Sequence, residues 1–337
     1  MMLKDKLQEQ IKEYIEDNQG LKHLNLNRNT EVRFLAQGEY NINFVLDSSP
    51  KKYVFRVNTG SQMENENQIK YEYDSIKFLE PSGVTPKVYF VDDSLSFFQY
   101  GILIMEFLEG EPLQYEKDLS KAATIFSRIH SLEVKQNHTH FKVENHIFSD
   151  RIKEGERLLA NVWESPHVSR EIKKFFDQFL GWAKANRSKE QYFINEPWLV
   201  VNNTEVNSHN FIIGKEKSYL IDWEKPVISD PAQDLTQFMA PTTTSWKTDY
   251  LLSEEEKELF FQTYIEGLKG EDQNIRERVH LYTPYLYLRA LTWCAYAFVE
   301  YHNPNNQIKN MDTFEKIKTF LQIDFMKKLC SPFWHSS

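Results

Sequence analysis

The hydrophobic period of the chain changes once, near Gly110, and this change constrains the fold more than any other feature. Residues 31–106 carry short runs rich in Val, Ile, Phe and Tyr between turn residues, which is typical of β-strands. Most segments after Gly110 repeat their apolar residues every three or four positions, which predicts helices. We therefore expect an α+β protein with a sheet near its N-terminal end and a mostly helical remainder.

The strand-rich part predicts a five-stranded, mainly antiparallel sheet with one crossing helix. Residues 31–58 read as strand, turn, strand, hairpin and strand, and the strand pattern resumes in "PKVYFVDD" and "YGILIMEFLEG". Between these segments, apolar residues from Ile69 to Leu79 fall on one helical face. A further amphipathic helix is expected at residues 2–18, where apolar residues recur at steps of four.

The part after Gly110 predicts a second, mostly helical lobe. Segments with a helical period include "DLSKAATIFSRIHSL", "REIKKFFDQFLGWAKAN" and "YLYLRALTWCAYAFVEYH", and a strand pair is expected around residues 211–222. We place the boundary in the short connector at residues 107–110. This gives an N-terminal lobe of residues 1–108 and a C-terminal lobe of residues 109–337.

Composition and charge exclude several classes of partner. The 40 basic and 49 acidic residues give a formal net charge of −9 without a Lys- and Arg-rich segment, so we expect no nucleic acid partner. No apolar run approaches the roughly 20 residues of a spanning helix, and the charged N-terminus lacks the apolar core of a signal peptide. Cys294 and Cys330 lie far apart, and the "HTH" run at residues 138–140 has no third ligand nearby, so we expect no disulfide or zinc site there. A cytoplasmic protein without membrane contact is expected, and its oligomeric state stays open.

The strongest chemical pattern lies in "LVVNNTEVNSHNFIIGKEKSYLIDWEKPVISDPAQDL", residues 199–235. Glu205 precedes Asn210 by five residues, and Asp222 ends a strand-like run that follows. An acid, an amide and a second acid at such spacing can hold a metal ion and a nucleotide. A small sheet lobe, a connector and a helical lobe with this loop form the arrangement that clamps ATP between two lobes.

On these residues the chain resembles the aminoglycoside phosphotransferase and choline kinase family, small-molecule relatives of the protein kinases, from about residue 30 to about residue 240. The family's "HGDxxxxN" is matched by residues 203–210, its later Asp by Asp222, and its "DPxxDL" by residues 230–235. The resemblance implies a protein-kinase-like two-lobed fold and a bound ATP, or GTP, with Mg²⁺. No segment ending in APE follows "IDWE", so no protein substrate is expected.

The resemblance also implies a role for each matched residue of the C-terminal lobe. Asn210 and Asp222 would hold Mg²⁺, and Glu205 would accept the proton of the substrate hydroxyl, which makes these three the predicted catalytic residues. Asp234 would brace the loop that carries Glu205. His130, at the end of a helix, matches a family position that we interpret as a packed structural histidine.

Six positions of the N-terminal lobe and connector match the family's nucleotide site. The glycine of "QGEYN" lets the backbone approach phosphate, the arginine of "YVFRV" offers a fork of donors to phosphate oxygens, and a helical glutamate positions that arginine. The connector's backbone would meet adenine. These predicted nucleotide-binding residues are Gly38, Asn41, Arg56, Glu72, Glu106 and Leu108. The structural alternatives are a plain hairpin glycine, an exposed strand arginine and a connector that is part of the core.

The matched loop departs from the family at three positions. Glu205 stands where the family has Asp, Asn203 where it usually has His, and His209 where it commonly has Gly. The extra methylene of Glu205 adds about 1.5 Å, and a misplacement of about 1 Å can lower a rate by about 10²-fold. Phosphoryl transfer, however, relies mostly on positioning and charge neutralisation.

Two functions follow from this pattern. The first, which we favour because the metal pair is intact, is an ATP-dependent phosphotransferase acting on the hydroxyl of a small molecule, such as an amino-alcohol, a sugar or an aminoglycoside-like compound. The alternative is a nucleotide-binding pseudokinase with a regulatory or scaffolding role. A third reading, a two-lobed binding protein without nucleotide, does not explain why the matched residues occur in order.

The acceptor site is less well defined by the sequence. The segment "MAPTTTSWKTDYLLSEEE" reads as a polar loop, and Trp246 within it is placed to edge an acceptor pocket. Tyr285, Arg289 and Trp293 recur at steps of four on one helical face, either as an aromatic box for a quaternary amine or as core. We expect core, and the net charge of −9 favours a cationic acceptor.

Overall fold

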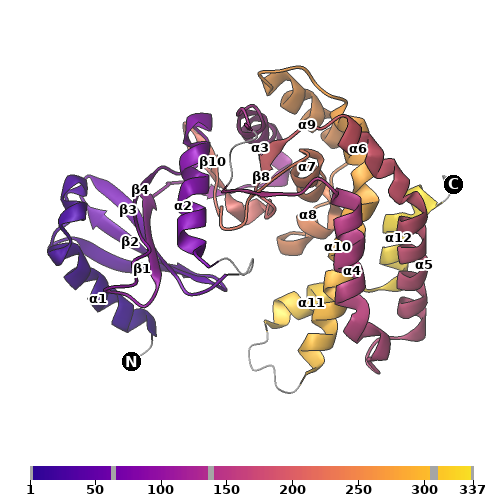
Figure 1. The fold of residues 1–337 in the computed structure, drawn as a ribbon, viewed down its shortest axis with the longest axis horizontal. Helices are drawn as coiled ribbons and strands as arrows, with labels where there is room; N and C mark the ends of the chain where they lie inside the picture. Colours follow the sequence, from indigo (N-terminus) through magenta and orange to yellow (C-terminus); the bar gives the residue numbers. More distant parts are fainter. Residues whose placement is uncertain (1–2, 62–65, 136–139, 304–309, 335–337) are drawn as a thin grey trace.

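The computed structural model describes residues 3–61, 66–135, 140–303 and 310–334. The N-terminal sheet lies on one side of the molecule and most helices lie on the other (Figure 1). The expectation for the "HTH" run rests partly on residues outside the described ranges. No described helix is long and apolar enough to cross a bilayer.

The N-terminal part is a five-stranded antiparallel sheet, as predicted, and its strands lie in the order β1-β2-β3-β5-β4. Helices α1 and α2 lie on opposite faces of this sheet (Figure 1). The elements of this part are α1 (Leu3–Asp17), η1 (Gln19–Leu24), β1 (Glu31–Gln37), β2 (Asn41–Ser48), β3 (Lys51–Asn58), α2 (Gln68–Leu79), η2 (Glu80–Ser82), β4 (Val88–Asp92) and β5 (Gly101–Glu106).

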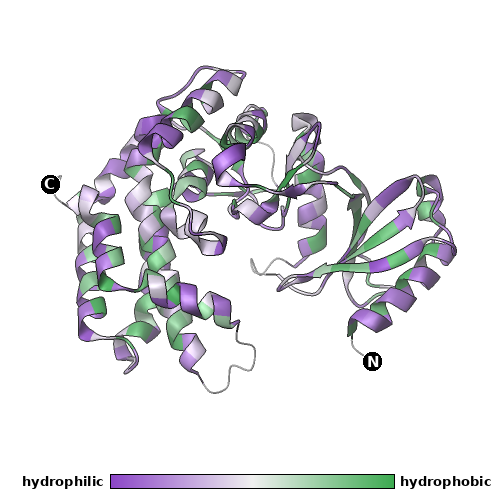
Figure 2. Ribbon diagram, turned by 180° about the vertical axis from the view of Figure 1, so that it is seen from behind, coloured by the Kyte–Doolittle hydropathy of each residue, from purple (hydrophilic) through white to green (hydrophobic). Residues whose placement is uncertain are grey.

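Alternate side chains of β5 from Ile102 to Met105 point to opposite faces of the sheet and are all apolar, so both faces must be buried. Ile102 and Ile104 belong to the core under α1, whereas Leu103 and Met105 belong to the core that continues through α2 into the helical part. Successive side chains of a strand point to opposite faces, so a fully apolar strand such as β5 must be buried on both sides. Figure 2 shows hydrophobic residues along strands of the sheet, and hydrophobic and hydrophilic residues alternating along the helices.

The remainder is mostly helical, with two small three-stranded sheets in the orders β10-β9-β6 and β7-β11-β8. The strands are β6 (Glu111–Pro112), β7 (Lys142–Val143), β8 (Val200–Asn202), β9 (Phe211–Ile213), β10 (Ser218–Leu220) and β11 (Val227–Ser229). The helices are α3 (Tyr115–His130), α4 (Ile147–Glu164), α5 (Arg170–Asn186), η3 (Arg187–Glu190), α6 (Gln191–Asn195), η4 (Ser208–Asn210), α7 (Ala232–Met239), α8 (Pro241–Lys247), α9 (Glu254–Gly267), α10 (Ile275–His302), α11 (Met311–Phe320) and α12 (Ile323–Trp334).

The prediction of a polar loop after Met239 is wrong, because this segment forms helix α8. Pro241 occupies the first turn of this helix, where its fixed φ and missing N–H suit a helix start. Hydroxyls within the segment bond backbone carbonyls, as when Thr244 Oγ1 donates to the Tyr250 carbonyl at 2.6 Å. The threonine run is therefore ordered, and it carries Trp246 on a helix.

A buried ion pair connects the start of α10 to the loop before α7. The fully buried guanidinium of Arg278 pairs with Asp230, and it donates to the carbonyls of Glu196 and Gln273, each at 2.7 Å. Removing one partner of a buried pair leaves an uncompensated charge, which is more destabilising than losing an exposed pair. The pair therefore holds the segment from which α7 begins.

We expect Arg278→Met to lower the free energy of unfolding by about 3–5 kcal/mol, because Asp230 would then be buried without its cation. Urea unfolding followed by circular dichroism measures this loss. Arg276→Met is the matched control, since Arg276 pairs with Glu258 at the surface and its loss should change stability by at most about 1 kcal/mol. Equal effects of the two substitutions would contradict a structural role for the buried pair.

Candidate functional site

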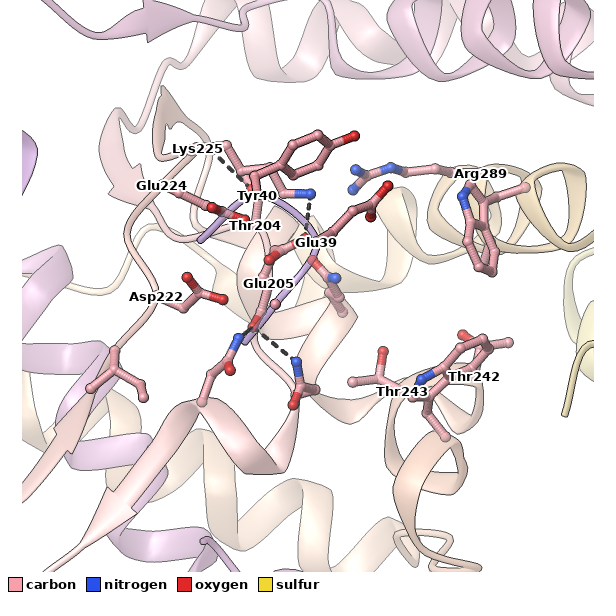
Figure 3. Close-up of a pocket in the computed structure, with 18 of the residues that line it drawn as sticks. Glu39, Tyr40, Thr204, Glu205, Asp222, Glu224, Lys225, Thr242, Thr243 and Arg289 are labelled. Atoms are coloured by element: carbon pink, nitrogen blue, oxygen red, sulfur yellow. Dashed lines mark hydrogen bonds and ion pairs between the residues drawn. The ribbon is translucent and has the colours of Figure 1, made fainter. Parts of the chain in front are cut away.

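A cavity of about 650 Å³ lies between the sheet and the helical part. Its walls come from the β1–β2 turn, β3, the loops after β8 and β10, and helices α7, α8, α10 and α11. Figure 3 shows side chains of these segments pointing toward one another across it. Its size lies within the roughly 300–1,000 Å³ of small-molecule sites.

A buried cation forms the wall on the sheet side. Arg56 of β3 pairs with Glu72 of α2, its Nη1 lies 3.6 Å from Asp222 Oδ1, and its Nε donates to Asn43 Oδ1 at 3.0 Å. Burial raises the pKa of Glu72 to about 7, although the charge of Arg56 opposes that shift. Arg56 is therefore not an exposed strand arginine: the structure brings together Arg56, Glu72 and Asp222.

The loop after β8 is held by the carboxylate of Asp234. Asp234 Oδ2 accepts from the Asn203 amide at 2.6 Å, and Oδ1 accepts from the Thr204 amide at 2.9 Å. Thr204 has a φ of +70°, a left-handed conformation that costs about 1–3 kcal/mol in a non-glycine residue. The two hydrogen bonds to Asp234 keep the loop in this conformation, which agrees with the bracing contact inferred from the sequence.

Asn203, at the family's histidine position, links this loop to the one after β10. Its Nδ2 donates to the carbonyls of Ile221 at 3.2 Å and Asp222 at 3.0 Å, and its Oδ1 accepts from the Glu205 amide at 3.0 Å. The side chain is fully buried. A single amide therefore sets the spacing between the backbones at Glu205 and Asp222.

Asn210 and Asp222 both line the cavity. Asn210 Nδ2 donates to the Glu205 carbonyl at 2.6 Å, so the amide oxygen is the atom that can coordinate a metal. Asp222 has a φ of +65°, which places a second strained residue at the site.

Glu224, which the sequence reasoning left without a role, completes a cluster of carboxylates. Oxygen atoms of Glu205, Asp222 and Glu224 all lie within 4.8 Å of one another. Burial, and then the charges of Asp222 and Glu72, raise the pKa of Glu224 to about 7. Hard oxygen donors in this arrangement fit Mg²⁺. The signal was a second acid two residues after Asp222 in "IDWE".

Lys225 is the other residue that the sequence reasoning missed. Its Nζ forms an ion pair with the carboxylate of Glu205, and both side chains are largely shielded from solvent. Its carbonyl accepts from Thr204 Oγ1 at 3.1 Å, which connects it to the same loop. Figure 3 shows Lys225 and Glu205 on the same side of the cavity. In the sequence, its position directly after "IDWE" could have indicated that Lys225 lies near the site.

The β1–β2 turn contributes Gly38 and Asn41 to the cavity wall. The Gly38 amide donates to the Asn41 carbonyl at 2.9 Å, and a Cβ on Gly38 would meet only that carbonyl oxygen, at 3.9 Å. No described neighbour therefore requires glycine here. The Asn41 side chain donates to Glu224 and accepts from Asn58 Nδ2 at 2.9 Å, which joins the turn to the carboxylate cluster.

The connector residues Glu106 and Leu108 do not line the described cavity. The Glu106 amide donates to the Lys87 carbonyl at 2.8 Å, and Glu106 Oε2 accepts from the Lys87 amide at 3.2 Å. These bonds extend the pairing of β5, an inner strand, toward the residue just before β4. Their contact with adenine stays a prediction.

The expectation that the aromatic face of α10 is core is correct for one residue and wrong for two. Tyr285 is buried and stacks on Phe148 with ring centroids 3.7 Å apart, but Arg289 and Trp293 line the cavity. Steps of four advance about 40° around an α-helix, so the stripe drifts from the core to the cavity. Trp246 of α8 lines the same cavity, and its place at an acceptor pocket stays a prediction.

His130 lies in the core, as interpreted from the sequence. Its Nδ1 is 2.9 Å from the Tyr264 hydroxyl, and burial lowers its pKa to about 3. The imidazole is therefore neutral at physiological pH, and it is not among the residues that line the described cavity.

Similarities to known proteins concern the family and the fold. A family model described as "Phosphotransferase enzyme family" matches residues 31–280. No curated protein matches the sequence. Among solved structures, similar folds include a choline/ethanolamine kinase family protein from Mesorhizobium loti (16% identity, 98% of this chain and 99% of that chain, TM-score 0.62). Choline kinase from Cryptosporidium parvum is similar as well (16%, 98% and 96%, TM-score 0.63), as is a spectinomycin phosphotransferase solved with ADP and spectinomycin (14%, 89% and 92%, TM-score 0.58).

We expect Asp234→Asn to loosen the loop that carries Glu205. Asparagine retains one acceptor oxygen, so one of the two backbone amides loses its partner at a cost of about 1–3 kcal/mol. Amide hydrogen exchange should accelerate at Asn203 and Thr204 and stay unchanged in the sheet. Unchanged exchange at both amides would show that Asp234 does not hold the loop.

Proposed function

We propose that this chain, which belongs to the phosphotransferase enzyme family, transfers the terminal phosphoryl group of ATP or GTP to the hydroxyl of a small molecule. The observation that carries the proposal is the meeting, in one cavity, of the Arg56 cation with the oxygen donors of Asn210, Asp222 and Glu224. Amino-alcohols, sugars and aminoglycoside-like compounds are the acceptor classes to test.

The nucleotide phosphates would lie between the β1–β2 turn and Arg56. A guanidinium offers a planar fork of donors that matches phosphate oxygens, and Glu72 fixes its orientation. The open space around the Gly38 backbone suits a close approach of phosphate, and Asn41 adds a polar side chain. Glu106 and Leu108 would then meet the base at the outer end of the site.

Mg²⁺ would be held by Asn210 and Asp222, with Glu224 as a further oxygen donor. When bound, the ion neutralises phosphate charge during transfer. Burial, and then the charges of nearby carboxylates, raise the pKa of Glu224, and a bound cation would offset the repulsion among these carboxylates. Three clustered carboxylates beside one amide thus support a magnesium-dependent reaction.

Glu205 would orient the acceptor hydroxyl and take its proton. The new bond forms between the hydroxyl oxygen and the γ-phosphorus while the bond from that phosphorus to the β–γ bridging oxygen breaks, and the nucleoside diphosphate leaves. The ion pair with Lys225 and the bond from the Glu205 amide to Asn203 hold the longer glutamate in place. These contacts offset the positional freedom that the extra methylene introduces.

The same ion pair favours a second candidate function. A Glu205 carboxylate that remains bound to Lys225 would not reach an acceptor hydroxyl. The protein would then be a nucleotide-binding pseudokinase, regulatory or scaffolding in role.

We expect ATP or GTP to raise the thermal unfolding temperature only when Mg²⁺ is present, because ligands that bind the folded state stabilise it. Asp222→Asn should abolish this magnesium-dependent shift. Asp249→Asn is the control, because the Asp249 side chain is almost fully exposed and lies outside the cavity lining. Unchanged nucleotide affinity in Asp222→Asn would refute the site assignment.

We expect Glu205→Ala to keep nucleotide binding and to lose transfer, measured as acceptor-dependent release of ADP. Glu205→Asp should lower turnover by about 10²-fold, because a shorter side chain moves the carboxylate by more than about 1 Å. Retained turnover in Glu205→Ala would mean that another group orients the acceptor. If the unmodified protein binds nucleotide but releases ADP neither with the three acceptor classes nor with a hydroxyl compound that carries a carboxylate, the pseudokinase function is favoured.

A further inference from the structure

The end of the cavity away from the carboxylate cluster carries one guanidinium and several aromatic rings. Arg289 and Trp293 come from α10, Trp246 from α8 and Phe320 from the end of α11. This composition differs from what the net charge of −9 indicated, because that charge is spread over the whole surface. The local groups decide what the acceptor end can bind.

The charge of Arg289 is only partly compensated within the protein. Its Nε lies 3.6 Å from Glu154 Oε2, but that same oxygen accepts from Arg151 Nη1 at 2.9 Å. Arg151 also bonds Glu144 at 2.9 Å, so the nearby acids are engaged mainly with Arg151. In Figure 3 the Arg289 guanidinium extends into the cavity toward Tyr40.

Four other carboxylates line the cavity, and Asp222 and Glu224 belong to the cluster at its other end. The remaining two do not cancel this guanidinium. Glu39 is exposed on the β1–β2 turn, where solvent screens its charge, and Glu205 is paired with Lys225. A guanidinium with an unfilled fork binds a planar carboxylate bidentately and repels a cation.

Aromatic rings line the same end of the cavity as this guanidinium. Trp293 is 40% exposed. Trp246 meets it edge to face with ring centroids 5.7 Å apart, and Phe320 lies 5.8 Å from Trp246. An exposed indole at the wall of a polar cavity offers apolar surface to the body of a ligand.

We infer that the acceptor carries, besides its hydroxyl, a carboxylate that binds Arg289 and a flat or apolar body that packs on Trp246 and Trp293. This inference rests on the proposed function, whose acceptor it specifies. A singly charged carboxylate fits better than a phosphate dianion, because the cavity wall contains more acids than bases. Thr242 and Thr243 add hydroxyls that can bond polar groups of the same ligand.

Three matched probes test the charge of the acceptor: 4-(2-hydroxyethyl)benzoate, its neutral amide and 4-(2-hydroxyethyl)benzylamine. They share the hydroxyl and the ring, and they differ in the charge and hydrogen-bonding capacity of the group opposite the hydroxyethyl chain. Isothermal titration in the presence of Mg²⁺ and a non-hydrolysable ATP analogue gives each affinity. We expect the benzoate to bind most tightly, and Arg289→Gln to weaken it about 10- to 100-fold with little change for the amide, as for loss of a charged hydrogen bond.

Two further variants keep the inference testable if Arg289→Gln unfolds. Arg289→Lys keeps the charge but loses the fork, so it should weaken the benzoate by a smaller factor. Trp293→Ala removes an exposed ring and should weaken all three probes equally. Tightest binding of the benzylamine, no binding of the benzoate at millimolar concentration, or unchanged benzoate affinity in Arg289→Gln would overturn the inference.

ADP release, measured separately with the same probes, distinguishes failure of the inference from failure of the proposed function. Benzoate binding that depends on Arg289, without ADP release in the presence of any acceptor, would support the proposed ligand class and refute the phosphotransferase function. ADP release that is fastest with the benzylamine and insensitive to Arg289→Gln would support the phosphotransferase and refute the ligand class.

Discussion

The buried guanidinium of Arg56 is the interaction on which the relation between the two parts of the molecule depends. It lies on β3, pairs with Glu72 of α2, and lies 3.6 Å from Asp222, which follows β10. A buried charge is tolerated only when it is paired. The position of α2 against the sheet and the position of Asp222 in the helical part are therefore coupled through one side chain, and the cavity opens where they meet.

Two residues with strained backbone conformations lie where these parts meet, and the buried side-chain amide of Asn203 links their loops. Thr204 and Asp222 both have positive φ, and Asn203 bonds the Asp222 carbonyl and the Glu205 amide. Strain of this kind persists only where surrounding contacts hold it. Contacts within the site therefore hold two of the three departures from the family's loop motif in place. Asn203 links the two loops by hydrogen bonds, and the Glu205 carboxylate pairs with Lys225 of the neighbouring loop.

Hydrophobic periodicity predicted most elements of the fold. It failed where contacts between segments distant in the sequence determine the structure. The apolar run of β5 and the helical face from Ile69 to Leu79 are visible in the sequence because burial leaves a periodic trace. The threonine segment was predicted as a loop because polar residues weaken that trace, although Pro241 starts a helix there. The roles of Glu224 and Lys225 left no periodic signal at all, since a carboxylate cluster and an ion pair are properties of packed loops.

The sequence by itself determined the α+β division near Gly110 and, through the spacing of Glu205, Asn210 and Asp222, the type of chemistry to examine. Only the tertiary structure decided which charges share one cavity and which residues of α10 line it. The physical reason is that strand and helix periods are local, whereas electrostatic energy depends on distances between segments far apart in the chain. Arg289 illustrates the difference: its spacing in the sequence is that of a core stripe, and its position in the structure is the cavity wall.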